Sequence, residues 1–224
     1  MFFFKKHKQP LCLPANFTVT GHTGCMNTPA NSLESIDVAA DCGVQIVEID
    51  LRYDKNGEPV LSHDEPKGGE VTLDEAFARV STYKDLLVNV DVKTTAYLEK
   101  VVPLAEKHGI LERIFFTGLF EKDIGTVKAK CPGVPYYLNY NVEKNKGEEY
   151  INSLIRKVKD CGAVGINCRH KAVTKAFVDA FRRNGLLVSV WTVSKPRHMR
   201  RALAFAPDNI TTREPATLMK VLSE

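Results

Sequence analysis

Two acidic residues, Glu48 and Asp50, lie two positions apart inside the apolar segment 46–51. Side chains two apart on a β-strand point to the same face, so these carboxylates project together and the apolar residues between them project to the opposite face. On the inner face of a parallel barrel, two carboxylates repel one another unless a cation neutralises them or they share a proton. The spacing therefore favours a metal site.

A second segment repeats this alternation, because Asp91 and Lys93 alternate with the valines at positions 88, 90 and 92. On neighbouring strands, Glu48, Asp50 and Asp91 would converge as oxygen ligands, the donors that Mg²⁺ and Ca²⁺ prefer. Lys93 beside them would neutralise a substrate phosphate. A buried salt bridge between Asp91 and Lys93 is the alternative, but three acids at one barrel face favour a functional role.

Two histidines, His22 and His63, lie where predicted strands end and loops begin. Imidazole titrates near neutral pH, and a pair of imidazoles beside a metal-bound ester suits general acid and base chemistry. We therefore predict that both residues are catalytic. Trp191, on a later predicted strand, would line the pocket and contact substrate, with a position in the core as the alternative.

The elements that must position these residues alternate between β-branched segments and amphipathic windows along the whole chain. Strands are predicted at 17–22, 45–51, 86–93, 113–118, 134–138, 163–167, 187–193 and 209–211. Helices are predicted at 31–42, 73–80, 96–108, 121–129, 147–160, 174–184, 196–205 and 215–222. Eight such units in 224 residues predict an α/β fold of the compact (β/α)₈ TIM-barrel type, with a doubly wound sheet as the alternative. Residues 52–63 are predicted to form a hairpin attached to the second strand.

Composition excludes several classes of protein. The 224 residues are 44% hydrophobic and 26% charged, without a linker-like segment, which predicts a single domain over 1–224 with an N-terminal arm at 1–15. No apolar run approaches the ~18 residues of a membrane span, and the order of residues 1–8 is not that of a signal peptide, which predicts a cytoplasmic protein. A net charge of +4 with mixed signs predicts no nucleic-acid partner.

Short motifs follow one another along the chain. They are HTG at 22–24, PANS at 29–32, EID at 48–50, HD at 63–64, VTLDE at 71–75, DVK at 91–93, VWTV at 190–193 and the closing segment 208–215. Their order resembles the glycerophosphodiester phosphodiesterase family. The resemblance extends over residues 22–218, and the combination of E-x-D with H-D is its most specific part.

That resemblance implies metal-dependent hydrolysis of a glycerophosphodiester to glycerol phosphate and an alcohol, in lipid and glycerol metabolism. It implies that Mg²⁺ or Ca²⁺ is held by Glu48, Asp50 and Asp91. His22 and His63 would be the general acid and base, in an order that the resemblance leaves open. Lys93 would contact the phosphate, and a small-molecule phosphodiester would be the substrate.

This chain also departs from the family pattern. Thr23 replaces an arginine, Ala30 replaces a glutamate, and Arg213 lies where the family usually has an aspartate. A short loop at 65–71 replaces the small subdomain that the family commonly inserts, which predicts a more open barrel mouth and tolerance of bulky headgroups. These departures leave two alternatives: lysophospholipase D-like or cyclising chemistry on another phosphodiester, and a barrel that binds an anionic ligand without turnover.

Overall fold

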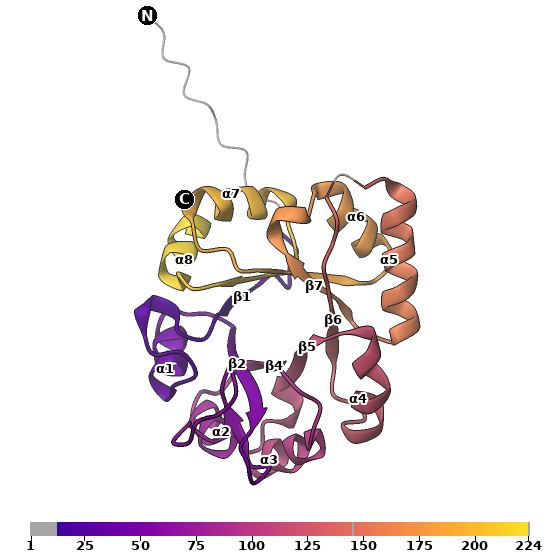
Figure 1. Ribbon diagram of the computed structural model, residues 1–224. Helices are drawn as coiled ribbons and strands as arrows, with labels where there is room; N and C mark the ends of the chain where they lie inside the picture. The colour runs from indigo at the N-terminus through magenta and orange to yellow at the C-terminus, as the bar shows by residue number, and fades with distance from the viewer. Residues whose placement is uncertain (1–12, 145, 224) are drawn as a thin grey trace, which may run out of the picture.

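Eight parallel strands form a closed barrel in the computed structural model, which describes residues 13–144 and 146–223 (Figure 1). The strands are β1 (Thr18–Gly21), β2 (Ile46–Tyr53), β4 (Leu87–Val92), β5 (Ile114–Leu119), β6 (Tyr136–Tyr140), β7 (Gly165–Arg169), β8 (Leu187–Trp191) and β9 (Asn209–Thr212). They follow the chain order around the barrel, and β1 closes it by pairing in parallel with both β2 and β9. The predicted TIM barrel is therefore confirmed, since a doubly wound sheet has open edges.

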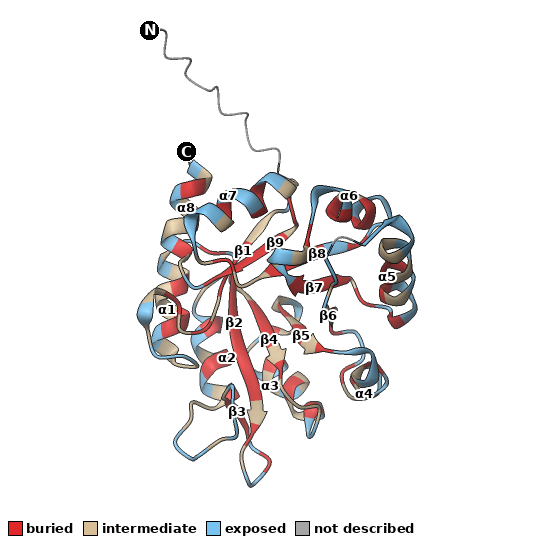
Figure 2. Cartoon of the chain, turned by 45° about the horizontal axis from the view of Figure 1, so that its top comes forward, coloured by how far each residue is buried: buried red, intermediate tan, exposed pale blue. Residues whose placement is uncertain are grey.

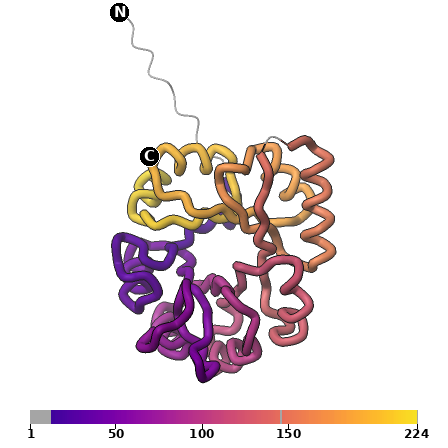
Figure 3. The backbone as a smooth tube through the Cα atoms, viewed as in Figure 1, coloured from indigo at the N-terminus to yellow at the C-terminus, as the bar shows by residue number. Residues whose placement is uncertain are grey.

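The helices surround the barrel in the same order, so the colour of the chain runs once around the ring in Figure 3. They are α1 (Leu33–Asp41), α2 (Leu73–Ser81), α3 (Val101–Lys107), α4 (Ile124–Lys130), α5 (Glu148–Cys161), α6 (Lys175–Arg183), α7 (Pro196–Phe205) and α8 (Pro215–Ser223). The predicted windows 96–108 and 121–129 begin with 3₁₀ turns, at Leu98–Lys100 and Glu121–Asp123. Pro103 lies in the first turn of α3, where a missing N–H is tolerated.

The core lies between the strands and the helices. The outward side chains of β2, Val47, Ile49 and Leu51, are at most 1% exposed, and the strands are the most continuously buried elements in Figure 2. The barrel interior is polar, because buried Asn209 donates to Thr20 Oγ1 at 2.7 Å and accepts from Ser189 Oγ at 3.1 Å. Such a packed, hydrogen-bonded interior leaves the ligand space at the ends of the strands.

An antiparallel hairpin extends β2 beyond the barrel. Strand β3 (Pro59–Leu61) pairs with the end of β2, after a turn in which Asp54 Oδ1 accepts bonds from the backbone N–H groups of Asn56 and Glu58, each at 2.8 Å. Gly57 in this turn has φ 75°, which favours glycine. The predicted hairpin is therefore present, and it delivers His63 to the rim of the barrel.

The predicted absence of an inserted subdomain is also confirmed, since residues 62–72 contain no helix or regular strand between β3 and α2. Of the predicted arm at 1–15, residues 1–12 lie outside the described part of the chain. Among the described helices, none is long and apolar enough to cross a membrane.

Candidate active site

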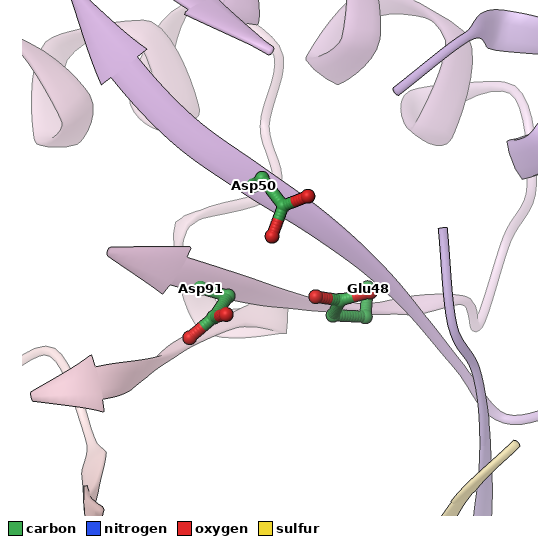
Figure 4. A group of neighbouring side chains, drawn as sticks. All are labelled: Glu48, Asp50 and Asp91. Atoms are coloured by element: carbon green, nitrogen blue, oxygen red, sulfur yellow. The ribbon is translucent and has the colours of Figure 1, made fainter. Parts of the chain in front are cut away.

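Three carboxylates meet at the mouth of the barrel. Glu48 and Asp50 project from β2, and Asp91 projects from β4, where it is the register partner of Asp50 (Figure 4). One oxygen from each acid lies within 4.8 Å of the other two. Glu48 and Asp50 are 6% and 2% exposed, so these charges are held almost out of water. The structure thus brings together the three acids that the strand spacing places on one face.

The loops around the acids hold each carboxylate in place. Glu48 Oε2 accepts a hydrogen bond from the Thr23 backbone N–H at 2.8 Å. The Asn31 side chain binds Asp50 twice, donating to Oδ2 at 2.9 Å and accepting from the Asp50 backbone N–H at 3.0 Å. The hydroxyl of Thr117 lies 3.1 Å from Asp91 Oδ1. Each acid is therefore oriented before any ligand arrives.

Asn31 is a positioning residue to which the sequence analysis assigns no role. Its backbone has φ 59°, in the left-handed region, and its N–H donates to Thr23 Oγ1 at 2.5 Å. The next residue, Ser32, caps α1 by accepting from Ser35 N–H. The PANS motif at 29–32 is the signal in the sequence, because its asparagine turns back onto β2 just before α1 begins.

If the three acids hold a divalent cation, replacing Asn31 by alanine is expected to weaken its binding by roughly 10- to 100-fold, the usual cost of losing a group that orients a metal ligand. The physical reason is that Asp50 loses both contacts with the Asn31 side chain. Isothermal titration calorimetry with Mg²⁺ measures the change. Asn184→Ala, at the end of α6, is the matched control. An unchanged dissociation constant in a folded Asn31 variant contradicts this role.

Gly118, at the end of β5, is required by the same cluster. It has φ 78°, and a Cβ at this position would lie 2.5 Å from Asp91 Oδ1 and 2.5 Å from the Val92 carbonyl oxygen. Any other residue would displace either the carboxylate or the backbone of β4. The absence of a side chain at Gly118 therefore leaves room for the Asp91 carboxylate.

The cluster carries an excess of negative charge. Burial raises the pKa of Glu48 well above its usual value, and the neighbouring Asp50 and Asp91 raise it further. Lys93 Nζ lies 2.7 Å from Asp50 Oδ1 and 2.5 Å from Asp91 Oδ2. Burial opposes the charge of Lys93, but the two carboxylates outweigh burial and raise the pKa of this lysine. The salt bridge weighed as an alternative is thus present within the acid cluster, and one ammonium faces three acids.

The donor set fits a hard divalent cation. All three candidate ligands are carboxylates, and Mg²⁺ and Ca²⁺ take oxygen ligands of this kind. A cation would also offset the cost of burying the Glu48 carboxylate and its repulsion by Asp50 and Asp91. The cluster can therefore hold the metal that the sequence analysis predicts.

The two predicted histidines lie on the wall of the same cavity, in different environments. His22 Nδ1 lies 2.7 Å from the Thr23 carbonyl oxygen and 3.5 Å from Glu48 Oε2. Since a carbonyl oxygen only accepts, Nδ1 carries the proton, which leaves Nε2 as an acceptor. Burial, followed by the nearby Arg213 charge, lowers the pKa of His22, so its imidazole is neutral at pH 7.

His63 lies on the outer rim and is 69% exposed. Its Nδ1 lies 2.9 Å from Asp64 Oδ1, and this contact lowers the pKa of Asp64. The backbone carbonyl of His63 accepts from Arg52 Nε at 3.0 Å, which ties the rim to β2. One histidine is thus enclosed beside the acids, and the other faces solvent beside a carboxylate.

These groups surround a cavity of about 540 Å³ at the carboxyl ends of the strands. That volume suits a small-molecule ligand. The predicted substrate residues Lys93 and Trp191 both line it. Two further cations line it as well, Arg169 at the end of β7 and Arg213 after β9. Neither arginine is predicted from the sequence to take part in the site. Arg169 is marked only by its position at the end of a barrel strand, and Arg213 also as a departure from the family pattern.

Two segments of the chain, 22–107 and 89–217, match the Glycerophosphoryl diester phosphodiesterase family. The chain belongs to this family. The resemblance inferred from the motifs is therefore confirmed, and the family is one of phosphoric diester hydrolases.

Curated relatives of this family member share about a quarter of its residues. A glycerophosphodiester phosphodiesterase from Caldanaerobacter subterraneus subsp. tengcongensis is 23% identical over 243 residues, covering 91% of this chain and 97% of the relative. A probable glycerophosphodiester phosphodiesterase 2 from Mycobacterium tuberculosis is 25% identical over 227 residues, covering 87% and 85%. The match to each relative therefore extends over most of both chains.

Solved structures share the fold of this family member. A putative glycerophosphodiester phosphodiesterase from Galdieria sulphuraria has a TM-score of 0.79 at 22% identity, covering 93% of this chain and 98% of its own. An Oleispira antarctica phosphodiesterase, in complex with the product sn-glycerol-3-phosphate, has a TM-score of 0.75 at 17% identity, covering 95% and 98%. Both structural similarities support the barrel fold.

One departure from the family pattern has a structural account. Thr23 replaces the arginine of the H-R-G motif, but its backbone N–H still binds Glu48. Its side chain is 3% exposed and contacts Asn31, so it does not line the cavity. Thr23 therefore orients Glu48 through its backbone N–H but does not add the positive side chain that an arginine would bring.

Proposed function

We propose that this chain hydrolyses glycerophosphodiesters to glycerol phosphate and an alcohol, with a divalent metal held by Glu48, Asp50 and Asp91. The observation that carries the proposal is the cluster of three carboxylates within 4.8 Å, beside His22 at the barrel mouth of a family member. When bound, a divalent cation polarises phosphoryl oxygens and offsets the charge that develops on them. The buried acids supply the negative charge that would retain it.

His22 is proposed as the general base. Its lowered pKa keeps the ring neutral at pH 7, and the bond from Nδ1 to the Thr23 carbonyl leaves Nε2 able to accept a proton from the attacking hydroxyl or water. Glu48, 3.5 Å from Nδ1, stabilises the imidazolium that results. The buried ring is thus oriented for proton abstraction.

His63 is proposed as the general acid. It stands on the solvent side of the cavity, where the departing alcohol leaves, and the Asp64 carboxylate 2.9 Å from Nδ1 orients the ring. Exposure to solvent allows the ring to recover its proton after each turnover. The two histidines therefore divide proton removal and proton donation between the inside and the outside of the cavity.

Lys93 and Trp191 are proposed to bind substrate. An ammonium group has three donors, and Asp50 and Asp91 engage two of those on Lys93, which leaves one for a phosphate oxygen. Trp191 lines the cavity and offers an apolar surface to the carbon atoms of an alcohol. Together they hold the diester across the acid cluster.

Phosphorus NMR of the purified chain, incubated with glycerophosphodiesters and lysophospholipids, tests the proposal. Glycerol phosphate is expected with Mg²⁺, Ca²⁺ or Mn²⁺ and is expected to be absent when EDTA is in excess. Lysophosphatidate or a cyclic phosphate as the main product would replace the proposal with lysophospholipase D-like or cyclising chemistry. If metal binds but none of the diesters gives a product, the alternative that remains is a barrel that binds an anionic ligand without turnover.

A further inference from the structure

A second, smaller cavity adjoins the catalytic cavity. It has a volume of about 200 Å³ and shares Arg169, Trp191 and Thr192 with the larger cavity. His170 and Lys171, on the turn that follows β7, complete its lining. We call this space the side pocket. The two cavities share three residues and are therefore direct neighbours.

The side pocket is positively charged and contains no acid. Arg169 and Lys171 are both exposed, and within the described chain neither forms an ion pair with a carboxylate. Arg169 instead lies over the Trp191 ring, with its guanidinium carbon 5.5 Å from the ring centroid. Lys93 differs, since Asp50 and Asp91 balance its charge. The charges of the side pocket are therefore free to meet a ligand.

One further cation, Arg201 on α7, adds to this positive field. The ring of His198, on the same helix, lies 5.2 Å from that of His170, and burial with neighbouring positive charges lowers the pKa of His198. Burial, together with the charges of His198, Lys171 and Arg201, lowers the pKa of His170 to about 4. His170 is therefore neutral at pH 7, and the charges of Arg169 and Lys171 dominate the side pocket.

These features exclude a cationic occupant. The Arg169 guanidinium already lies over one face of the Trp191 ring, where a quaternary ammonium group would bind, and the two positive side chains would repel such a group. The glycerol moiety of a glycerophosphodiester is uncharged, so these cations would only donate hydrogen bonds to its hydroxyls. The remaining candidate is the other alcohol of the diester, provided that it carries negative charge.

We propose that the side pocket binds an anionic group, a carboxylate or a phosphate, on the alcohol that the enzyme releases. The proposal rests on the proposed function, because it places the phosphodiester itself across the acid cluster. Arg169 would face both the diester and the added anion, and Lys171 only the anion. The enzyme would then discriminate in favour of anionic headgroups and against choline and ethanolamine.

A matched pair of substrates tests the proposal, because glycerophosphoserine differs from glycerophosphoethanolamine only by a carboxylate. The wild type is expected to show kcat/KM at least about tenfold higher for the serine diester, the effect of one charge-assisted hydrogen bond. Lys171→Gln is expected to reduce this ratio by about tenfold. Lys195→Gln removes the same charge from a neighbouring loop outside the lining and should keep the wild-type ratio.

A binding measurement separates this proposal from the proposed function. Trp191 is the one tryptophan of the sequence and lines both cavities, so its fluorescence reports on diester binding without turnover. Lys171 lines only the side pocket, so the Lys171→Gln variant assigns a difference in binding to that pocket. In EDTA, glycerophosphoserine is expected to bind about tenfold more tightly than glycerophosphoethanolamine, and Lys171→Gln should abolish the difference. If no diester is hydrolysed but this difference appears, the proposed function fails and the side pocket stands. If both diesters are hydrolysed and bound equally well, the side pocket proposal is wrong.

Discussion

Glu48→Gln is expected to lower kcat/KM in the presence of Mg²⁺ by roughly 10³-fold, because a catalytic metal contributes several kcal/mol and each 1.36 kcal/mol is a factor of ten. Glutamine keeps an oxygen that can accept from the Thr23 N–H but removes one charge from the cluster. Steady-state kinetics against Mg²⁺ concentration measures the loss. Full turnover with a normal metal response would disprove the site.

Thermal unfolding distinguishes a lost ligand from a lost fold. Mg²⁺ is expected to raise the Tm of the wild type, because a ligand that binds only the folded state stabilises it, and to leave the Tm of the Glu48 variant unchanged. Without metal the variant should be at least as stable as the wild type, since a buried carboxylate is removed from beside two others. Glu112→Gln, an exposed acid at the opposite end of β5, is the matched control and should keep both responses.

His22→Ala is expected to reduce kcat by about 10²- to 10⁴-fold, the usual contribution of a general base. The pH profile gives the sharper readout. A base acts in its neutral form, so activity is present above the pKa of His22 and falls as the pH drops through it. Burial and Arg213 lower that pKa, so the acid limb of the wild type should lie below pH 6.5. His22→Ala should lose this limb, whereas His108→Ala, whose ring contacts Asp74 on α2, should keep it.

The leaving group separates the roles of the two histidines. His63→Ala is also expected to reduce kcat by about 10²- to 10⁴-fold with natural diesters, because the alkoxide then leaves without a proton. With a p-nitrophenyl ester of glycerol phosphate, the leaving group needs no proton, so most of the His63→Ala loss should disappear while the His22→Ala loss remains. If the activated ester rescues the His22 variant instead, the two assignments are reversed. A loss below about threefold for His63→Ala would make that residue structural.

The sequence predicts the acid cluster because its geometry is local. Glu48 and Asp50 share a face through the two-residue period of a strand, and eight repeated units make the barrel that brings Asp91 beside them. The supporting contacts are not local. Asn31 binds Asp50 from nineteen positions away, through a left-handed backbone conformation that no periodicity encodes. The motif marks Asn31, but only the folded chain shows what it holds.

The cations of the cavity illustrate a second kind of limit. Lys93 is predicted to contact phosphate, and the structure adds that Asp50, on the neighbouring strand, shares its charge with Asp91. Arg169 belongs to none of the motifs, and Arg213 belongs to the closing segment 208–215 only as a departure from the family pattern. Their importance depends on the closure of the barrel, which places the ends of β7 and β9 around the same space as β2.

If the proposed roles hold, two tasks are separated along the chain, which Figure 3 traces from indigo to yellow. The proposed metal ligands and proton-transferring residues precede position 94, whereas the side pocket is built from residues 169–171 and 191–192. Mutation in the later segment can therefore alter which alcohol is released without touching the acids of β2 and β4. A directed-evolution library confined to residues 165–200 would sample new leaving groups while the proposed metal ligands and the two histidines stay unchanged. The same separation would allow duplicated copies of this protein to evolve different substrates while the residues proposed for hydrolysis stay the same.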